Sequence, residues 1–403
     1  MRQVTTSRPD RSAGHVLRGP IIAIGLFAGL TAPLITPARG LAQVPTPSPL
    51  ELPAGAASTE SDNSREDGPY ILLQPDSSVV VMYMRDGVLE RQTLPDMTAF
   101  RSAGVGGAYI KNDSISRVPP EYGQLEFKGV SRVFAVSDVH GDYESLVEVL
   151  QNGGVLDKDL HWNWGNGHLV VLGDVFDRGD RVNECLWLIH RLEDESQRAG
   201  GRVHYLLGNH ELMVLRGDYR YVHPKYLTGI VTATGIEYKD MYGTGTLLGR
   251  WLRSKNTVVK INGVLFVHGG ITPLLAEREV SLKQIDDGIR SAIDEAPSAL
   301  RADTLGQFLL GRQGPLWYRG YLQEIESAYP QASCEDIEVL LKHYDATTVV
   351  VGHSEVGEIH GWHDGRVMTI DVPVEELGGL QALLLTAGRF YRIEADGDTR
   401  VIE

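Results

Sequence analysis

The stretch VFAVSDVHGD, residues 133–142, joins a short apolar run to a cluster of polar side chains. The uncharged run Val133–Val136 is typical of a strand buried on both faces of a sheet. Asp138 and His140 follow it two residues apart, and we expect their side chains to point to the same side. Gly141 then allows the backbone to turn sharply. A strand that ends in such a cluster predicts a site at the edge of a sheet.

Similar apolar runs alternate with helical stretches through most of the remaining chain. Ser145–Leu150 and Arg181–Arg198 are predicted helices. The predicted buried strands are Val133–Val136, Leu169–Leu172, Val203–Leu206, Val264–Val267, Thr348–Val351 and Val367–Ile370. This alternation predicts a layered α/β domain.

Five polar clusters each follow one of these strands closely. They are Asp138–Asp142, Gly173–Gly179, Gly208–Glu211, His268–Gly270 and Gly352–Ser354. Because the carboxyl ends of strands form the binding edge of an open α/β sheet, clusters far apart in sequence are expected to meet at one site. A single cluster of this kind is usually an ordinary turn, whereas five in this order argue against coincidence.

The clusters contain the donor atoms of a dinuclear metal site. The expected ligands are Asp138, His140, Asp174, Asn209, His268 and His353. A carboxylate such as that of Asp174 can bridge two cations. Oxygen and nitrogen donors without thiolate favour Mn, Fe or Zn, and the imidazoles argue against Mg or Ca.

The residues around these clusters divide the chain further. Residues 43–68, rich in Pro, Ser and acidic residues, are a predicted linker. Residues 69–128 are a predicted β-rich lead-in, with a hairpin signal in Val79–Met84 and Val88–Leu94 around an Asp-Gly pair. The catalytic domain is then expected over residues 129–403, closing with a second hairpin near Asp396.

The first 42 residues have the features of an export signal. Four arginines precede an uncharged apolar run, Pro20–Ile35, and small residues follow it. The run is shorter than the roughly 20 residues of a membrane-spanning helix. We therefore expect a periplasmic or secreted protein with no membrane span after cleavage. An uncleaved N-terminal anchor is the alternative.

Composition excludes some classes of function. The formal net charge of −15 argues against a nucleic-acid partner, because binding its backbone needs clustered Lys and Arg. The two cysteines, Cys185 and Cys334, form no Cys-x-x-Cys pair, so a thiolate zinc site is unsupported. Whether they form a disulfide stays open, although Cys185 shares an apolar helical face that suits a buried thiol.

The five clusters, in this order, resemble the motifs of the calcineurin-like metallophosphoesterase superfamily, and within it the phosphoprotein phosphatases. The resemblance runs from Val133 to Asp371. It implies a layered α/β-β/α sandwich with two central mixed sheets flanked by helices. It also implies that Asp138, His140 and Asp174 hold one metal, while Asp174, Asn209, His268 and His353 hold the other.

Within this superfamily the chain is most similar to the Shewanella-like protein phosphatases. Trp162–Trp164, Asp177–Arg181 and Leu316–Tyr321 carry that similarity. Leu207 stands where the eukaryotic serine/threonine enzymes usually have Arg, and their C-terminal Ser-Ala-Pro-Asn-Tyr motif has no counterpart. Ser137 replaces the Gly usual before the first motif Asp, a change expected only to tighten the turn.

The resemblance also implies catalytic roles. A hydroxide activated by two metals would attack phosphorus, with His210 as general acid, and Asp177 would hold the tautomer of that ring. Arg178 and Arg319 would bind phosphate oxygens. Asp177 could instead cap a helix that begins near Asp180, and Arg319 could be a surface residue stacked on an aromatic ring. Glu211 is expected to stabilise the local turn.

The substrate is less constrained than the reaction. The tyrosines at 219, 221, 226, 238 and 242, with Trp317–Tyr321, could form an aromatic wall for a phosphoaryl group, or could pack an insertion onto the core. The leading hypothesis is a phosphomonoesterase for phosphoproteins or peptides, with Ser/Thr or Tyr preference open. The alternatives are a small-molecule phosphatase or dinucleoside polyphosphate hydrolase, and a catalytically inactive, metal-stabilised binding protein.

Overall fold

The computed structural model describes residues 65–102, 123–300, 303–322 and 331–402. All of them belong to one compact unit, which spans Thr59–Glu403. The predicted export signal lies outside the described residues, as does most of the predicted linker.

The first central sheet has six strands in the order β15-β14-β13-β5-β6-β7. These are β5 (Arg132–Val136), β6 (His168–Val171), β7 (Arg202–Tyr205), β13 (Ala382–Thr386), β14 (Arg389–Ile393) and β15 (Thr399–Val401). β5, β6 and β7 are parallel, and β13 joins β5 in antiparallel register. β14 and β15 pair around Asp396, so the predicted closing hairpin is confirmed.

The second central sheet also has six strands, in the order β11-β12-β10-β9-β8-β4. They are β4 (Glu126–Phe127), β8 (Val258–Ile261), β9 (Val264–Val267), β10 (Thr348–Val351), β11 (His360–Trp362) and β12 (Val367–Thr369). β4 comes from the predicted lead-in and pairs in parallel with β8, so that segment contributes directly to a central sheet.

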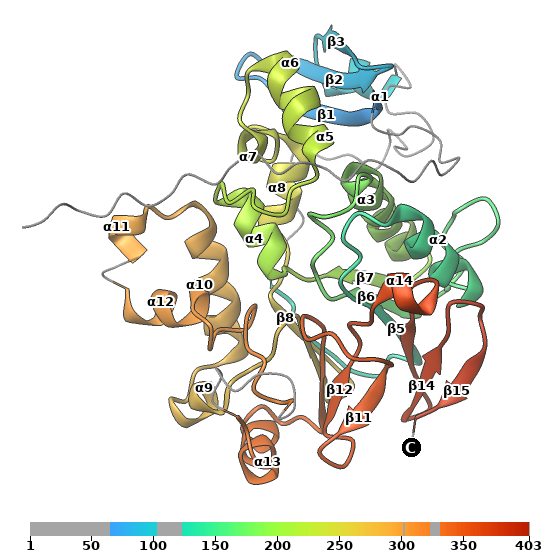
Figure 1. Ribbon diagram of the computed structural model, residues 1–403, viewed down its shortest axis with the longest axis vertical. Coiled ribbons are helices and arrows are strands. Elements are labelled where there is room, and N and C mark those ends of the chain that lie inside the picture. Colours follow the sequence, from blue (N-terminus) through green and yellow to red (C-terminus); the bar gives the residue numbers. More distant parts are fainter. Residues whose placement is uncertain (1–64, 103–122, 301–302, 323–330, 403) are drawn as a thin grey trace, which may run out of the picture. The chain divides into compact units, whose positions relative to one another are not determined.

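The two sheets pack face to face, and helices cover their outer faces (Figure 1). Alternate residues of one strand therefore enter different cores. Val170 and Leu172 pack between the sheets, whereas Leu169 and Val171 pack with the helix-bearing core. Burial on both faces is why these strands are continuously apolar, and the expected sandwich of two mixed sheets is confirmed.

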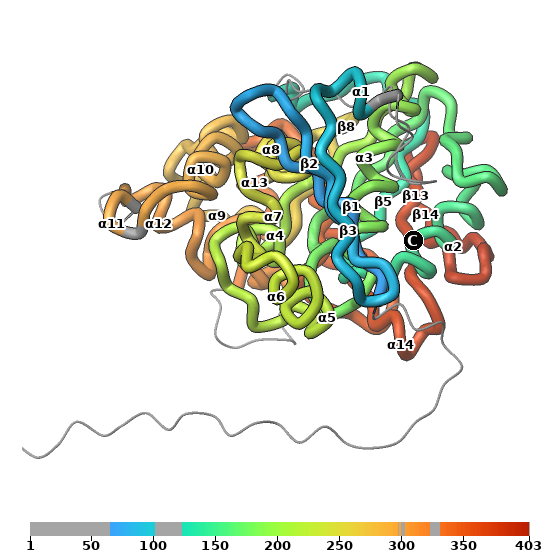
Figure 2. The backbone as a smooth tube through the Cα atoms, turned by 90° about the horizontal axis from the view of Figure 1, so that it is seen from above, coloured from blue at the N-terminus to red at the C-terminus, as the bar shows by residue number. Residues whose placement is uncertain are grey.

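A third, antiparallel sheet consists of β1 (Asp67–Leu73), β2 (Val79–Arg85) and β3 (Val88–Leu94), followed by α1 (Met97–Ser102). Seen from above, it lies over α3 (Val182–Arg198) (Figure 2). Asn183 Nδ2 donates to Asp67 Oδ1 at 2.7 Å, and Trp187 Nε1 donates to the Pro69 carbonyl at 3.1 Å. These bonds attach the three-stranded sheet to α3.

The remaining helices flank the sheets or form insertions between strands. They are α2 (Tyr143–Asn152), α4 (Asn209–Leu215), α5 (Pro224–Tyr226), the π-helix η3 (Leu227–Val231), α6 (Thr232–Thr234), α7 (Tyr238–Met241), α8 (Leu247–Arg253), α9 (Pro273–Glu277), α10 (Leu282–Asp294), α11 (Pro297–Leu300), α12 (Thr304–Leu310), α13 (Cys334–His343) and α14 (Val374–Leu377). No helix in the described part of the chain combines the length and apolar character needed to cross a bilayer.

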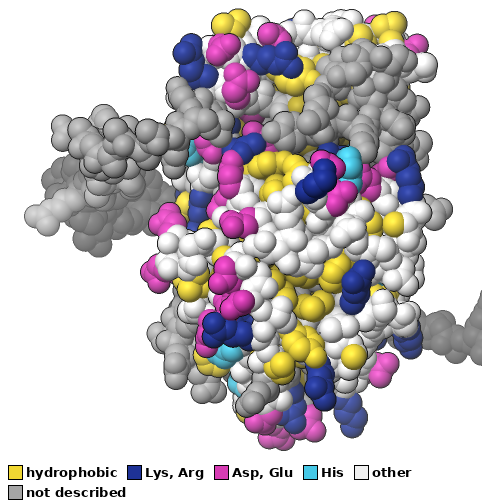
Figure 3. Space-filling view, turned by 90° about the vertical axis from the view of Figure 1, so that its right-hand side faces the viewer, with side chains coloured by type: hydrophobic (Ala, Val, Ile, Leu, Met, Phe, Trp, Pro, Cys, Tyr) yellow, Lys and Arg dark blue, Asp and Glu magenta, His cyan; other side chains and the backbone are white. Residues whose placement is uncertain are grey.

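Both cysteines are free, Cys185 in the buried core and Cys334 at an exposed position. The helical packing expected for Cys185 is thus observed, and the structure contains no bond between the two thiols. On the face drawn in Figure 3, basic side chains lie scattered among acidic and apolar ones rather than in one patch.

Candidate active site

Loops that follow the strands are bonded to one another at the carboxyl edge of the two sheets. The amide of Asp138 donates to the Gly173 carbonyl at 3.2 Å, and that of His140 donates to the Asp174 carbonyl at 2.8 Å. Between the second sheet's loops, the Gly352 amide donates to the His268 carbonyl at 2.8 Å. These bonds join clusters whose bonded residues are 34 to 84 positions apart in sequence, as expected for this edge.

Several site residues adopt left-handed backbone conformations. They are Asp138, His140, Asp174, Asp177, Arg178 and His353, with φ between 48° and 71°. Such conformations cost of order 1–3 kcal/mol for residues other than glycine and concentrate at functional sites. β5 ends at Val136, so Asp138 and His140 occupy a turn. The strand alternation used to predict their common direction therefore does not apply to them.

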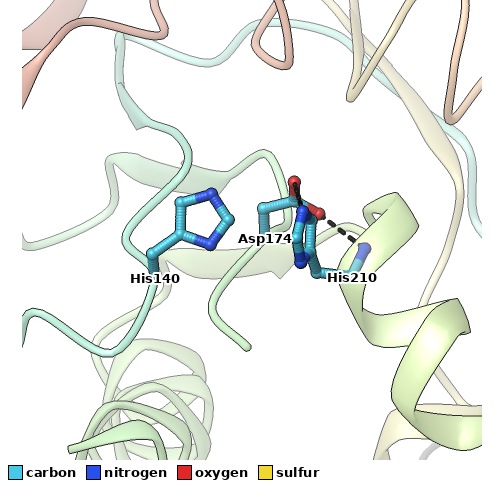
Figure 4. Close-up of side chains that lie close together, drawn as sticks. All are labelled: His140, Asp174 and His210. Carbon is cyan, nitrogen blue, oxygen red and sulfur yellow. Dashed lines mark hydrogen bonds and ion pairs between the residues drawn. The ribbon is translucent and has the colours of Figure 1, made fainter. Parts of the chain in front are cut away.

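Asp174 lies at the centre of the site. Its Oδ1 accepts from the His210 amide at 2.9 Å, and its Oδ2 is 3.2 Å from His268 Nε2 and 3.8 Å from His210 Nε2. Figure 4 shows His140 and His210 on either side of this carboxylate. Ligand atoms of His140, Asp174 and His210 all lie within 4.8 Å of one another.

A second group of donors shares the same carboxylate. Ligand atoms of Asp174, His268 and His353 lie within 4.8 Å of one another, and all three side chains are buried. Asn209 Oδ1 is 2.9 Å from His268 Nε2. His353 Nε2 is buried without a hydrogen-bond partner in the protein. An unpartnered imidazole nitrogen facing a buried carboxylate is what a metal ligand without its cation would present, so these residues fit a metal site.

Other atoms hold the rings of two expected ligands in place. His268 Nδ1 lies 2.8 Å from the Leu172 carbonyl, and His140 Nδ1 lies 2.9 Å from the Phe176 carbonyl. With Nδ1 donating to a carbonyl, Nε2 is the nitrogen of each ring that would bind a cation, after releasing any proton it carries. This orientation fits both imidazoles to a role as metal ligands.

Asp138 lies at the same edge but belongs to neither of the two donor groups. Its Oδ2 accepts from Ser137 Oγ at 2.5 Å and from the His353 amide at 3.0 Å. The Ser137 hydroxyl therefore fixes the direction of the Asp138 carboxylate, a contact that the sequence analysis did not foresee. A Cβ on Gly352 would stand 1.9 Å from that hydroxyl and 2.4 Å from Asp138 Oδ2, so this position requires glycine.

The buried charges at the site perturb one another. Burial opposes ionisation of Asp174, but the neighbouring His268 and His210 outweigh it and hold its pKa well below the usual value. Burial would lower the pKa of His268, yet Asp174 and Asp138 raise it to about 10. Burial, together with His268 and Arg319, lowers the pKa of His353 well below normal. The Asp174 carboxylate therefore stays ionised and available to a cation.

His210 is bonded to Asp177, as the sequence analysis expected. Its Nδ1 lies 2.6 Å from Asp177 Oδ2, and both side chains are buried. Burial lowers the pKa of His210, but Asp174 and Asp177 more than offset this and raise it. The N-cap of α3 is Arg181, so Asp177 does not cap that helix.

Glu211, next to His210, has a structural role. Its carboxylate accepts from the amides of Asp174, Val175 and Gly208 at 2.7–2.8 Å and from the Tyr205 hydroxyl at 2.8 Å. These hydrogen bonds therefore join the cluster Gly173–Gly179 to the cluster Gly208–Glu211. The expectation that it stabilises the local turn is confirmed.

The two arginines differ in their surroundings. Arg178 is exposed beside the site, and its amide donates to the Tyr221 carbonyl at 2.8 Å. Arg319 is half-buried, and its guanidinium donates to the His353 carbonyl. Arg319 is thus hydrogen-bonded to the loop that contains His353. This contact differs from the alternative, in which Arg319 is a surface residue stacked on an aromatic ring.

The sequence analysis gave no role to Asp371, which lies just beyond β12. Burial raises the pKa of Asp371 well above its usual value, and the nearby Asp138 raises it further. A sixth strand end therefore carries a carboxyl group whose ionisation depends on that of the first motif. The rule that selected the other five clusters, a polar residue directly after a buried strand, also applies to it.

Most tyrosines of the insertion pack onto the core, which was the second of the two alternatives for them. Tyr226, Tyr238 and Tyr242 are fully buried and pack their rings together. Tyr221, in contrast, is 50% exposed, and its ring centroid lies 5.3 Å from that of His210. Trp317 is half-buried with its ring 5.7 Å from that of His353.

Residues 131–356 match the family of calcineurin-like phosphoesterases. Over 235 residues the sequence is 28% identical to Shewanella-like protein phosphatase 1 of Plasmodium berghei, covering 58% of this chain and 63% of that protein. It is 27% identical to Shewanella-like protein phosphatase 2 of Arabidopsis thaliana over 317 residues, covering 68% of this chain and 78% of the relative.

The fold is also similar to a solved structure. The crystal structure of a cold-active protein tyrosine phosphatase from a psychrophilic Shewanella species superposes with a TM-score of 0.73 at 32% sequence identity. The alignment covers 84% of this chain and 99% of that one. The resemblances drawn from the motifs are thereby confirmed at the level of family and fold.

Proposed function

Because this chain belongs to the calcineurin-like phosphoesterase family, and is a metal-dependent hydrolase of phosphate esters, we propose that it acts on the monoesters of phosphoproteins or phosphopeptides. The observation that carries the proposal is the His210–Asp177 pair, 2.6 Å apart, beside the buried donors around Asp174. A proton donor next to a cation site is the arrangement that ester hydrolysis needs.

The family implies divalent metal ions, and we propose that two are held here. The ligands would be Asp138, His140 and Asp174 for one, and Asp174, Asn209, His268 and His353 for the other. When bound, such ions supply Lewis acidity and lower the pKa of water. The oxygen and nitrogen donor set favours Mn, Fe or Zn.

His210 would protonate the leaving oxygen from Nε2. Asp177 accepts at Nδ1, which keeps a proton there and leaves the other nitrogen directed toward Asp174. Because Asp174 and Asp177 more than offset burial and raise the pKa of His210, the ring keeps its proton to a higher pH than an ordinary histidine does. Arg178 and Arg319 would bind phosphate oxygens, and the exposure of Arg178 leaves its guanidinium free to reach a substrate.

The relatives favour a protein substrate. Two of them are Shewanella-like protein phosphatases, and the similar solved structure is a protein tyrosine phosphatase. We propose phosphotyrosine peptides as the preferred class. We also propose, from the sequence of residues 1–42 alone, that the protein is exported to the periplasm or secreted.

The test is phosphate release by the protein reconstituted with manganese. The panel contains phosphotyrosine and phosphoserine peptides of otherwise identical sequence, sugar phosphates and a dinucleoside tetraphosphate. We expect chelator-sensitive turnover of the peptides. Turnover of only the small esters or the dinucleotide would contradict a protein phosphatase, and metal binding without any turnover would favour a binding protein.

A further inference from the structure

Tyr221 lies beside His210, the proposed proton donor. Its ring is 5.3 Å from the His210 ring, with 49° between their planes. The His210 ring is also 4.8 Å from that of His140. Tyr221 is 50% exposed whereas His210 is buried, so Tyr221 is a neighbour of His210 that a substrate in solvent can reach.

The position of Tyr221 is fixed by the active-site loops. Its carbonyl accepts from the Arg178 amide at 2.8 Å, which ties the aromatic residue to the second polar cluster. The Arg220 guanidinium lies 5.7 Å from the ring centroid and is itself bonded to Asp218. An aromatic ring held by its backbone beside a proton donor can present its face to a ligand without first being ordered.

Three other tyrosines of the insertion cannot do this. Tyr226, Tyr238 and Tyr242 are at most 1% exposed, and Tyr226 stacks on Tyr238 at 5.4 Å. Their burial means that a substrate cannot reach their rings. Among the described residues with strongly exposed large apolar side chains, Tyr221 is the aromatic one.

We infer that Tyr221 is a specificity-determining residue whose ring stacks against the aromatic leaving group of aryl phosphates such as phosphotyrosine. The inference rests on the proposed function, because it takes His210 as the donor to the leaving oxygen. An aryl group on that oxygen lies next to His210 and hence next to Tyr221. An alkyl group, as in phosphoserine, offers no ring to stack and gains little from the contact.

Stacking acts equally on the bound substrate and on the transition state, so it contributes to KM rather than to kcat. We expect Tyr221→Leu to raise KM for a phosphotyrosine peptide roughly 3- to 10-fold, the range of aromatic pair contributions, with kcat unchanged. The matched phosphoserine peptide should keep both constants. Tyr221→Phe, which keeps the ring, should restore the wild-type KM.

A binding measurement separates this role from catalysis. Calorimetric titration of the manganese-loaded protein with phenylphosphonate and methylphosphonate should show weaker binding of the phenyl compound alone in Tyr221→Leu. A fall in kcat for both peptides would overturn the inference, since it would mean that Tyr221 only positions His210. Unchanged KM for the phosphotyrosine peptide would overturn it as well. A wild-type protein inactive on both peptides would instead reject the proposed function and this inference with it.

Discussion

At the scale of single residues, His210 is constrained by four different neighbours. Nδ1 is bonded to Asp177, the His210 amide is bonded to Asp174, and the ring contacts those of His140 and Tyr221. These contacts restrict the ring to one orientation with Nε2 toward the site. A group held in this way needs no reorganisation when it transfers a proton.

Replacing the donor should therefore affect turnover without emptying the metal site. His210→Asn keeps a side chain of similar polarity but cannot deliver a proton, and we expect kcat to fall about 100- to 10,000-fold. Metal content, measured by mass spectrometry after dialysis, should stay at the wild-type value. Turnover close to wild type would remove His210 as the general acid, and loss of metal would identify it as a ligand instead.

Replacing Asp174 should reduce the metal content, unlike replacing His210, because the Asp174 carboxylate belongs to both donor groups. Asp174→Asn removes the charge on which both cations would depend, so we expect bound metal and activity to fall together. The loss of affinity should exceed the roughly 10- to 100-fold that outer-sphere partners contribute. Asp177→Asn serves as the control, since it lowers kcat through His210 and should retain metal. A fully loaded, active Asp174→Asn protein would contradict a shared ligand.

At the scale of elements, the strands were predictable and their connections were less so. Val264–Val267 and Thr348–Val351 begin and end as predicted, because strands buried on both faces must be continuously apolar. β4 escaped prediction because two residues carry no periodic signal, and its pairing with β8 depends on tertiary contacts. The short helices between Pro224 and Arg253 were not predicted either, because they are too short to carry a periodic signal. Packing of tyrosine rings stabilises them instead.

The site was predictable to the extent that it follows from strand ends. His268 and His353 could be placed together from sequence because each lies within two residues of the end of a buried strand of one sheet. Asp371 follows the same rule as the other clusters and could have been included. The left-handed turns and the Ser137–Asp138 bond could not be predicted, because they depend on the exact path of each loop rather than on strand periodicity. Which tyrosine remains exposed likewise depends on how the insertion packs.

The contact between the loops after β5 and β10 gives a prediction at this scale. In Gly352→Ala the new methyl group would collide with Ser137 Oγ and Asp138 Oδ2, which are bonded to each other. We expect about 1–3 kcal/mol lower stability and weaker metal binding, because one of the displaced atoms belongs to an expected ligand. Thermal unfolding and metal titration would measure both.

Gly357→Ala is the matched control, since no atom lies within 4 Å of the position of its new Cβ. It should leave stability and metal affinity close to wild type. Equal effects of the two substitutions would show that flexibility of the segment, rather than the close approach at Gly352, sets the requirement for glycine.

At the scale of the whole molecule, the two ends of the parallel strands have opposite character. The carboxyl ends bear ionised groups around Asp174. Toward the amino ends, His168 and His204 are buried, hydrogen-bonded to each other at 2.9 Å, and packed against Phe127 of the other sheet. Burial lowers the pKa of His168 to about 4 and that of His204 well below normal. The core is therefore closed at this edge by neutral imidazoles.

His190, on α3, shows the same pattern. Its ring packs against those of Trp187 and Trp251. Burial, with Lys255 nearby, lowers its pKa to about 3. In the unfolded chain each of these histidines titrates near its ordinary value of 6.5. Above that pH neither state binds the proton and the stability is fully present. As the pH falls below this value, the unfolded chain binds protons that the folded protein does not bind, so the free energy of unfolding decreases.

We therefore expect the free energy of unfolding to fall between about pH 6.5 and pH 4, by less than the limit of roughly 1.4 kcal/mol per pH unit for each buried histidine. His190→Gln removes one such group, so its stability relative to wild type should improve from about pH 7.5 to about pH 5. Urea unfolding of both proteins in chelator would measure this difference without metal binding. Because the ligands titrate alike in both proteins, their contribution cancels in the comparison. A difference that is the same at both pH values would show that His190 binds its proton as readily in the folded protein as in the unfolded chain, contrary to its lowered pKa beside two indole rings.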